Sequence, residues 1–545
     1  MPQITLCQEN EILTCPKGEN LYRVLAAHGF MDAPCGGVGC CGKCRVRIIG
    51  PSQTTPQTTE ATFFTPAEQE AGWRLACLYT VTEDIIVELP ESQQVAEIIS
   101  SGYCVPFTMQ PEIQKRLDGE GNTVVWQGKE IIAMEAGDHT KNCYGVAIDI
   151  GTTTIVASFL DFTSGKEMTS LSCLNSQKAF GQDVISRIHY AVNNGLGGVI
   201  LQKTILQDIR LLLEDFLTEH HLSTCDIVAI TIAANTTMVH LLAGQPVASL
   251  GNFPYLPAFQ GPWQVNGIDW QLPVASYCQI YCLPAVAAFV GGDITAGILA
   301  CGLQETKENI LFLDIGTNGE MVLAKEGQLC ACSCAAGPAL EGMNISCGVR
   351  AAQGAIEDVT ILNGEVAYTT IGGGMPTGLC GSGLLSAVAE LRRTGILQKS
   401  GRLREHALVE TVDGKRRFVL DATYGISLTQ QDIRHVQLAK GAILAGIYAL
   451  LAAAELTLDQ VDKVLVAGQF GAHLKADSLT GAGFIPQELG ERIAYVGNTA
   501  KSGAVMCLLG ADQRRQAEDI VANVNYIELS TLDGYNDLFV KCMEF

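Results

Sequence analysis

The chain has 545 residues, 48% of them hydrophobic and 17% charged, so it is long enough for several folded domains and disorder is not expected to dominate. Its 57 acidic and 35 basic residues give a formal net charge of −22, which argues against a general binder of nucleic acid or anionic membranes. The first residues, MPQITLCQEN, lack the basic and apolar regions of a secretory signal. We therefore expect the 21 cysteines to be reduced, in a cytoplasmic setting.

The first 90 residues read as a compact β-rich unit around a glycine-rich cysteine loop. ITLCQ and EILTCP predict a hairpin, NLYRVLAAHGF a short helix, and KCRVRIIG and IIVELP two strands that flank the loop. This order, with the last cysteine ahead of the last strand, is similar to that of 2Fe-2S ferredoxins. The similarity implies a β-grasp, ferredoxin-like α+β domain over residues 1–90.

The cysteines of this unit have the spacing of cluster ligands. The loop CGGVGCCGKC places Cys35, Cys41 and Cys44 at C-x5-C-x2-C spacing, and Cys77 follows in RLAC. Four thiolates are the usual ligands of a 2Fe-2S centre, and plant-type ferredoxins have four residues in the first gap. Using Cys40 would give that gap of four, but Cys41 is preferred because it leaves two residues before Cys44. The alternatives are a zinc knuckle or buried structural thiols, and the loop lacks the histidine that would favour zinc.

The rest of the chain divides into a weakly patterned segment and a long α/β region. Between residues 91 and 142 we expect a linker with a short middle element, in which VVWQ, a Gly-Lys turn and EIIAM predict a small hairpin. Over residues 143–545, strand-like runs alternate with helical ones, as in α/β domains. The most apolar run, residues 441–456, is too short to span a bilayer comfortably and is predicted to be a buried core helix.

An internal repeat predicts that the α/β region is duplicated. YGVAIDIGTTTIVASFLD at 144–161 and ILFLDIGTNGEMVLAKEG at 310–327 each contain an apolar strand, an Asp-Ile-Gly-Thr turn and a second strand. Two such copies predict two halves, about 143–305 and 306–545, with a cleft between them.

The two turns have the chemistry of a phosphate site. In each copy an Asp ends a buried strand and a Gly-Thr turn follows, so that N–H and hydroxyl groups face whatever lies at the hairpin tip. Asp149 and Asp314 are predicted to hold Mg²⁺, through waters because that ion loses its hydration shell reluctantly. The predicted phosphate contacts are Gly151, Thr152, Thr153, Gly316, Thr317 and Asn318.

Three further motifs are expected at the same cleft. GLCGSGLLSAVAEL opens a helix with Gly381 and Ser382, where unpaired N–H groups can bind an anion. VLVAGQFGAHL is a buried strand followed by a glycine turn, which would let an adenosine lie against the backbone. In GGDITAG, Asp293 is either a third cleft acid or the N-cap of a helix. The adenosine-turn residues are Gly468, Gln469 and Gly471, and Glu341 and Lys440 are further candidates for lining the site.

DIGTTT, DIGTNGE, GLCGSG and VAGQFG, in this order, resemble the phosphate and adenosine motifs of the superfamily of acetate and sugar kinases, heat-shock proteins and actin. With the cysteine loop ahead of them, the chain resembles, over nearly its full length, the ATP-dependent reductive activators of corrinoid proteins. The resemblance implies an actin-like ATPase fold, a 2Fe-2S cluster, ATP and Mg²⁺. It implies one-electron reduction of an inactive Co(II) corrinoid protein to Co(I), which reactivates a methyltransferase system.

The implied partners are that corrinoid protein and a low-potential electron donor, without nucleic acid or membrane, and a homodimer is compatible with the resemblance. Two other functions fit the same motifs. In a redox-gated small-molecule kinase, the cluster would control phosphotransfer to a hydroxyl acceptor. In an actin-like assembly or chaperone ATPase, the cluster would be structural.

Overall fold

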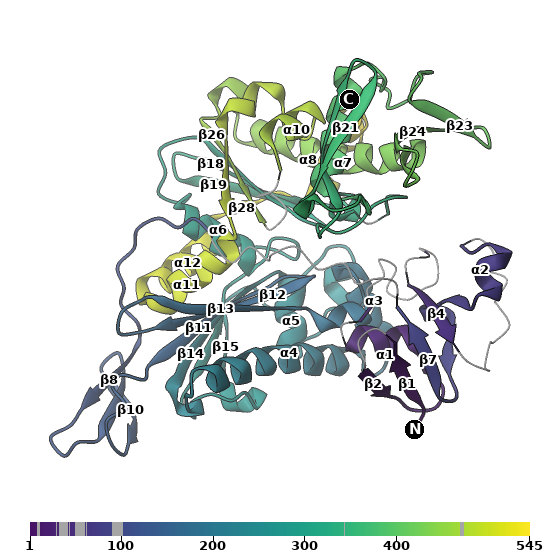
Figure 1. Cartoon of the computed structure of the whole chain (residues 1–545). Helices are drawn as coiled ribbons and strands as arrows, with labels where there is room; N and C mark the ends of the chain where they lie inside the picture. The colour runs from purple at the N-terminus through teal and green to yellow at the C-terminus, as the bar shows by residue number, and fades with distance from the viewer. Residues whose placement is uncertain are drawn as a thin grey trace.

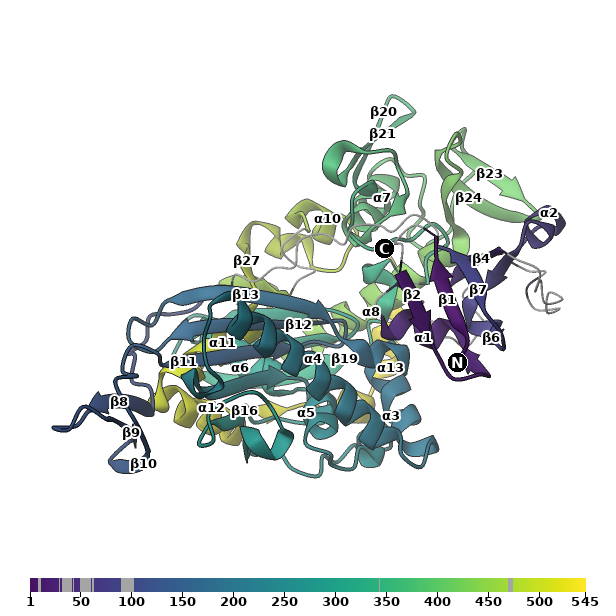
Figure 2. The ribbon, with the colours of Figure 1, turned by 60° about the horizontal axis from the view of Figure 1, so that its bottom comes forward.

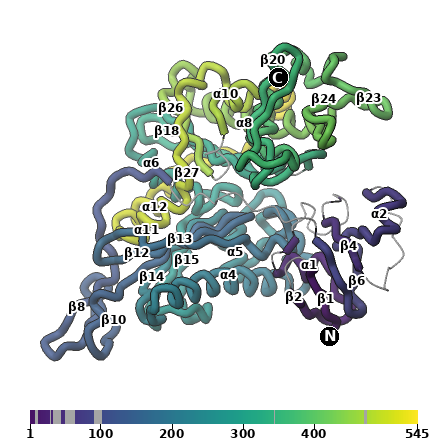
Figure 3. Tube along the Cα trace, in the orientation of Figure 1, coloured from purple at the N-terminus to yellow at the C-terminus, as the bar shows by residue number. Residues whose placement is uncertain are grey.

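The computed structural model of the chain consists of a ferredoxin-like unit, a small projecting sheet and two α/β halves (Figure 1). Figure 3 traces the chain through these parts, from the N-terminal unit to the C-terminal helices. The described residues are 1–7, 11–28, 30–31, 42, 44–49, 60, 63–89, 102–342, 344–468 and 474–545.

The N-terminal unit has a five-stranded sheet in the order β2-β1-β7-β4-β5, with helix α1 packed on it. β1 pairs antiparallel with β2 and parallel with β7, which makes this the mixed sheet expected of a β-grasp ferredoxin. Apolar side chains alternate inward along β1 and β7 and pack against Leu21 and Leu25 of α1. The elements are β1 Gln3–Leu6, β2 Glu11–Thr14, β3 Glu19–Asn20, α1 Leu21–Ala27, β4 Arg45–Ile49, α2 Pro66–Glu70, β5 Trp73–Leu75, β6 Thr80–Val81 and β7 Ile85–Glu88.

The segment that follows runs along the α/β region before forming its own sheet. Tyr103, Val105 and Gln110 donate backbone hydrogen bonds to Val496, Ala300 and Leu509, respectively. The chain then forms the antiparallel sheet β10-β9-β8, which projects from the molecule (Figure 1). The hairpin expected at VVWQ-GK-EIIAM is therefore present. The strands are β8 Ile113–Leu117, β9 Thr123–Gln127 and β10 Glu130–Glu135.

The first half is a six-stranded sheet in the order β13-β12-β11-β14-β16-β15, with helices on both faces. On one face, Val146 and Ile148 of β11 pack with Ile205 and Ile209 of α4. On the other face, Ala147 belongs to the core that contains α6. The elements are β11 Tyr144–Ile150, β12 Thr154–Asp161, β13 Glu167–Leu174, α3 Val184–Asn193, α4 Gly197–Glu219, β14 Ile227–Ala234, α5 Thr236–Leu242, β15 Trp263–Asn266, β16 Gln279–Cys282 and α6 Gly292–Cys301.

The second half also has a six-stranded sheet, in the order β28-β19-β18-β17-β26-β27. It adds a small mixed sheet, β21-β20-β22, and a small antiparallel sheet, β23-β24-β25. Its elements are β17 Ile310–Ile315, β18 Gly319–Lys325, β19 Gln328–Cys334, β20 Ala355–Leu362, β21 Glu365–Thr370, β22 Gly378–Leu379, α7 Gly381–Arg393, β23 Val409–Val412, β24 Lys415–Asp421, β25 Ile426–Thr429, α8 Gln430–Ala453, β26 Lys463–Ala467, α10 Ala476–Gly481, β27 Ile493–Gly497, α11 Thr499–Leu509, α12 Ala511–Asn523, β28 Asn525–Tyr526 and α13 Tyr535–Cys542.

The pairing pattern establishes the duplication. β11 pairs antiparallel with β12 and parallel with β14, and β17 pairs antiparallel with β18 and parallel with β26. In each half a third antiparallel strand follows on one side and a further parallel strand on the other. The repeat detected in the sequence is thus the central hairpin of each half, and five strands of the two sheets share one topology. The sixth strand differs: β15 extends the first sheet beside β16, and β28 extends the second beside β19.

Helices α6 and α11 form a layer between the two large sheets, which joins the halves. Their buried side chains share one core with Ala147 of the first sheet and Phe312 of the second. The backbones approach closely: a Cβ on Gly503 of α11 would lie 2.3 Å from the carbonyl oxygen of Ala296 in α6. Although α11 and α12 come late in the chain, they lie beside the first sheet (Figure 1).

Helix α8 confirms the buried helix predicted from the apolar run. Within the described part of the chain it is the one helix that is long and apolar enough to cross a membrane, yet 72% of its apolar stretch is buried inside the protein. It starts with a capping box between Thr429 and Asp432 and packs against β18 and β19. Its hydrophobicity therefore serves the core of the second half.

Candidate functional site

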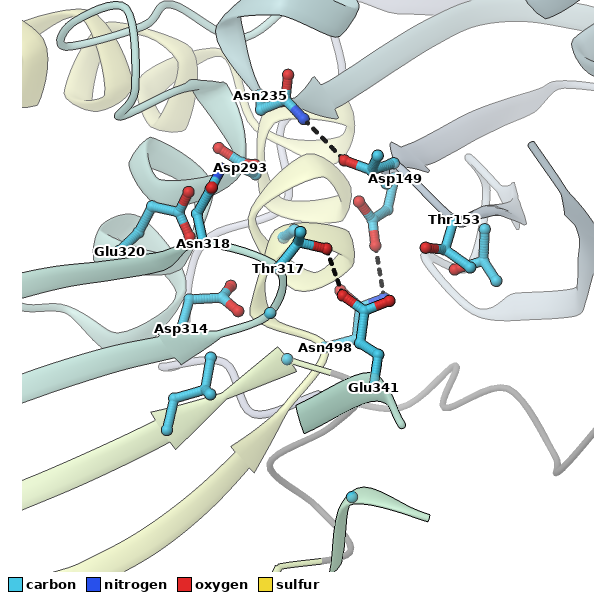
Figure 4. Close-up of a pocket in the computed structure, with 18 of the residues that line it drawn as sticks. Asp149, Thr153, Asn235, Asp293, Asp314, Thr317, Asn318, Glu320, Glu341 and Asn498 are labelled. Atoms are coloured by element: carbon cyan, nitrogen blue, oxygen red, sulfur yellow. Dashed lines mark hydrogen bonds between the residues drawn. The ribbon is translucent and has the colours of Figure 1, made fainter. Parts of the chain in front are cut away.

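Both repeated hairpin tips open onto one cavity of about 300 Å³ (Figure 4). In each tip the N–H of the glycine closes the turn: Gly151 donates to Thr154 and Gly316 donates to Asn318, both at 2.9 Å. The cavity is lined by every described residue that was predicted as a cleft acid, a phosphate contact or part of the adenosine turn. These are Asp149, Gly151, Thr152, Thr153, Asp293, Asp314, Gly316, Thr317, Asn318, Gly381, Ser382 and Gly468.

Three helices begin at this cavity. The first residues of α7 and of α11, and Asp293 in the first turn of α6, all line it. The first N–H groups of a helix have no partner within the helix, and the helix dipole makes that end positive. The three helix starts and two hairpin tips therefore give the cavity walls many donors suited to a polyanion such as a triphosphate.

Asp149 and Asp314 lie at equivalent positions of the two hairpins. The side-chain amide of Asn498, the N-cap of α11, donates to Asp149 Oδ2 at 2.7 Å. Burial raises the pKa of Asp149 to about 7, against the effect of this hydrogen bond. Burial also raises the pKa of Asp314 to about 7, and the charges of Asp293 and Asp149 add to the rise.

Asp293 is a cleft acid and not a helix cap. Gly291 is the N-cap of α6, and Asp293 lies one residue inside the helix, where its Oδ1 accepts from the N–H of Ile294 at 2.9 Å. Burial raises the pKa of Asp293 to about 6. The N-cap interpretation was therefore wrong, because the chain turns into the helix two residues earlier, at the glycine pair.

Glu320 is a fourth acid that the sequence reasoning did not assign, although it ends the motif DIGTNGE. It lies on the same side of the cavity as Asp293 and Asp314 (Figure 4). Burial followed by these two charges raises its pKa well above the ordinary glutamate value, against a hydrogen bond from Asn318. Among the described residues, no ion pair neutralises any of the four carboxylates. Four acids held around one cavity, without an ion pair among the described residues, give it a preference for a cation, although the charge of Lys501 favours the ionised form of Asp149.

The cavity also contains polar groups that fix the two tips. Thr317 donates its hydroxyl proton to Glu341, and the Asn235 amide donates to the Thr152 hydroxyl at 3.5 Å (Figure 4). Asn235 and Asn498 each cap a helix, and a signal for them existed as an Asn directly before a helical run. Arg350 also lines the cavity, and no pattern in the sequence indicated it.

The backbone conformation and the close approach of Asp314 require glycine at position 468. Its φ is +90°, and a Cβ there would lie 2.6 Å from Asp314 Oδ1. The other two residues of the predicted adenosine turn, Gln469 and Gly471, lie outside the described residues. Lys440, in contrast, does not reach the cavity: it donates to the carbonyls of Cys542 and Glu544 beneath the C-terminal segment.

The ferredoxin-like unit brings together two of the four predicted cluster ligands. Cys44 immediately precedes β4 and Cys77 lies in a short 3₁₀ turn, and their sulfurs are 3.2 Å apart. This separation exceeds the S–S bond length of a disulfide. The Ala76 N–H donates to the Cys44 carbonyl at 2.8 Å, which fixes the two segments. Cys35 and Cys41, as well as the alternative Cys40, lie outside the described residues.

The described part of the chain fits the two groups that the sequence implies. Two buried thiols from distant segments meet, as cluster ligation requires, and the four acids face one cavity. No three described His, Cys, Asp or Glu side chains stand close enough to enclose a metal ion directly. Magnesium held through waters, as expected for Asp149 and Asp314, is compatible with such spacing.

Comparison with known protein families matches three parts of the chain. Residues 4–82 match a 2Fe-2S iron-sulfur cluster binding domain, residues 144–306 the RACo middle region, and residues 308–545 the C-terminal domain of RACo, described as the ASKHA domain. The family's "middle region" is thus the first α/β half and not the segment 91–142.

Individual relatives match over most of the chain. The corrinoid activation enzyme RamQ of Eubacterium limosum is 29% identical over 92% of this chain and 92% of its own length. The [Co(II) methylated amine-specific corrinoid protein] reductase of Methanosarcina barkeri is 23% identical over 73% and 76%. The solved structure of a reductive activator for corrinoid, iron-sulfur protein superposes with a TM-score of 0.71 at 30% identity, covering 100% of this chain and 98% of that one. The chain therefore belongs to the family of reductive activators of corrinoid proteins, with a 2Fe-2S ferredoxin domain joined to an ASKHA ATPase domain.

Proposed function

We propose that the protein reduces the Co(II) form of a corrinoid protein to Co(I) by one electron, with ATP bound in the cleft between the two halves, and so reactivates a methyltransferase system. The observation that carries this proposal is that one chain holds both a cluster-type cysteine pair and a cavity into which two phosphate-type hairpins open. The printed functions of RamQ and of the Methanosarcina reductase support it.

We assign roles in the cleft as follows. The N–H groups of the two turns and of the α7 start bind phosphate oxygens, and Gly468 leaves room for the adenosine side. Asp149 and Asp314 orient a hydrated Mg²⁺, and Asp293 positions a water molecule. The side-chain hydrogen bond between Asn318 and Glu320 holds the tip of the second turn.

In the ferredoxin-like unit, Cys35, Cys41, Cys44 and Cys77 ligate the cluster, and a bound 2Fe-2S centre supplies a one-electron carrier. Cys44 and Cys77 are preorganised by β4 and the 3₁₀ turn. Serine variants at Cys40 and Cys41 test the third ligand: the 2Fe-2S absorbance disappears with Cys41→Ser. Its loss with Cys40→Ser alone contradicts the assignment.

The energetic requirement explains why ATP is needed. The equilibrium constant of a one-electron transfer changes tenfold for every 59 mV. A cobalt centre whose reduction potential lies a few hundred millivolts below that of the cluster is therefore not reduced without coupling. ATP provides coupling if its binding favours a complex in which the partner's cobalt is easier to reduce, since two binding events on one protein are linked.

We further propose the division 1–90, 91–142 and 143–545, with halves meeting near residue 305, and a cytoplasmic protein that takes electrons from a low-potential donor. The family matches begin and end close to these boundaries.

An anaerobic assay tests the function. The cluster is reconstituted, a reductant and a Co(II) corrinoid protein are added, and Co(I) absorbance is followed with and without Mg-ATP. Co(I) that forms only with Mg-ATP supports the proposal. ATP turnover that requires a hydroxyl acceptor would instead indicate a redox-gated kinase, and ATP turnover indifferent to cluster loss would indicate an assembly ATPase.

A further inference from the structure

A short segment, residues 175–187, lies between the first phosphate turn and the ferredoxin-like unit; we call it the bridging segment. It contains a 3₁₀ turn, Ser176–Ala179, and the start of α3. On one side it holds the hairpin tip of β11 and β12, and on the other it packs against α1 of the ferredoxin-like unit. Figure 2 shows α1 beside the first half at the α3 end.

The bridging segment holds all three carbonyl groups of the phosphate turn. The buried side chain of Asn175 donates to the carbonyl of Gly151 at 2.9 Å, and its backbone N–H donates to that of Thr153 at 2.9 Å. Arg187 donates to the carbonyl between them, that of Thr152. The turn is therefore fixed from behind through its carbonyl groups.

Arg187 is the central group of this arrangement. It is fully buried, and besides Thr152 its guanidinium donates to the Gly181 carbonyl at 2.8 Å and to Gln177 Oε1 at 3.1 Å. Within the described residues, no carboxylate forms an ion pair with it. Burial lowers the pKa of Arg187 to about 9, and the charges of Asp183 and Asp208 oppose this lowering without forming an ion pair. A guanidinium suits several carbonyl acceptors at once. Its positive charge lies directly behind the turn that is assigned to phosphate.

The opposite side of the bridging segment belongs to the ferredoxin-like unit. Ala179 is buried in that unit's core, and Phe180 packs against it. The Gln182 side chain donates to the hydroxyl of Tyr22 in α1 at 3.1 Å. Gly181, whose carbonyl accepts from Arg187, lies between these docking residues. The same few residues therefore contact Arg187 and α1.

We propose that Arg187 is a positioning residue that couples nucleotide binding at the first phosphate turn to the seating of the ferredoxin-like unit on the bridging segment. This inference rests on the proposed ATP-binding role of the cleft. The carbonyl of Thr152 and the N–H of Thr153 belong to one peptide group. A phosphate that accepts from this N–H polarises the peptide and strengthens the Arg187 hydrogen bond. The anionic phosphate also adds to the compensation that Asp183 and Asp208 give to the buried charge of Arg187.

Both effects have the same sign: nucleotide stabilises the seated ferredoxin-like unit. Because coupling between two binding equilibria is reciprocal, seating must strengthen nucleotide binding by the same factor. Arg187→Met removes all of its donations to the turn and to Gly181, whereas Gln182→Leu removes the contact with Tyr22 and leaves Arg187 in place. The two variants thus interrupt the route at different points.

Hydrogen exchange of the cluster-loaded full chain, with Mg²⁺ and a non-hydrolysable ATP analogue, tests this coupling. In the native sequence, saturating analogue slows exchange of the amides of α1, residues 21–27, by about tenfold. In Arg187→Met, α1 exchange is the same with and without saturating analogue, while the cluster absorbance is unchanged. Arg210→Met, on α4 of the same half, keeps the full slowing and controls for loss of an arginine.

Gln182→Leu supplies the independent variant should Arg187→Met not fold. Because seating of the ferredoxin-like unit strengthens nucleotide binding, loss of the Tyr22 contact weakens binding of the analogue by about threefold. Unchanged α1 exchange in the native chain at saturation, or full slowing in Arg187→Met, overturns the coupling. Because no corrinoid protein is present, this result is separate from the proposed function: slowing without any Co(I) formation would contradict the function alone, and ATP-dependent Co(I) formation without slowing would contradict the coupling alone.

Discussion

At the scale of single residues, the cleft combines features that favour ligand binding over stability. Asp149, Asp293, Asp314 and Glu320 are held together with raised pKa values, although isolated carboxyl groups would be charged at neutral pH. Such groups destabilise the ligand-free protein and gain compensation when a hydrated cation and phosphates bind. Perturbed acids in a cavity are typical of functional sites.

Asp314→Asn tests, through the pH dependence of stability, whether the buried carboxyl groups destabilise the ligand-free protein. The folded pKa of about 7 exceeds the unfolded value of 3.8, so the folded state binds more protons between these values. Stability contributed by the protonated group is therefore lost as pH rises from about 4 to 7. The asparagine variant lacks this loss, and we expect it to be more stable than the native chain without ligand at pH 8 by on the order of 2 kcal/mol.

Urea unfolding of both proteins at pH 5 and pH 8 measures the effect. The stability difference should be larger at pH 8, and the variant should no longer bind Mg-ATP. An equal stability difference at both pH values would show that ionisation of Asp314 does not destabilise the folded protein.

Gly468 provides a second test at this scale. Alanine there combines a left-handed backbone with a Cβ 2.6 Å from Asp314 Oδ1, so we expect nucleotide binding to weaken about tenfold and stability to fall by about 1 to 3 kcal/mol. Gly414→Ala is the matched control, because it has a φ of +75° and no atom within 4 Å. It should share the backbone cost and leave nucleotide affinity, measured by calorimetry, unchanged. Equal affinities in the two variants would contradict the role of Gly468.

At the scale of elements, the sequence predicted what is encoded locally. The central hairpin of each half, the helix after GLCGSG and the buried helix α8 were predicted because their periodicity and turn residues lie within one short window. The cavity walls were predicted where a motif ends a strand, as with Asp149 and Asp314. Asn235, Asn498, Arg350 and Glu320 were not assigned because their roles depend on which distant elements meet at the cavity. Arg187 gave no local signal, since its contact with the phosphate turn, at the Thr152 carbonyl, joins residues far apart in the sequence.

The crossing of α6 and α11 shows another feature invisible to local patterns. Gly503 permits contact with Ala296, and a methyl group there would overlap a backbone oxygen that has little freedom to move. We expect Gly503→Ala to lower the free energy of unfolding by about 2 to 3 kcal/mol. Gly198→Ala in α4, with nothing within 4 Å, should change it by less than about 1 kcal/mol. Thermal unfolding of both variants measures this, and an unperturbed Gly503→Ala would mean that the helices are not so closely packed.

At the scale of the whole molecule, the ferredoxin-like unit and the ATPase cleft are joined through two routes. The segment 102–110 binds along α6, α11 and β27, and the bridging segment packs against α1. The helices α6 and α11 in turn begin at the cavity and lie between both sheets. A change in the cleft therefore has rigid elements through which it can affect the position of the ferredoxin-like unit.

The central claim is that nucleotide in this cleft permits electron transfer from the same protein to a corrinoid partner. The most direct measurement is a stopped-flow experiment in which the pre-reduced, cluster-loaded protein and a Co(II) corrinoid protein are mixed with Mg-ATP and Co(I) absorbance is recorded. We predict that Co(I) appears only after Mg-ATP is added, and that Asp314→Asn with an intact cluster spectrum gives none. Formation of Co(I) at the same rate before and after addition of Mg-ATP would contradict the account.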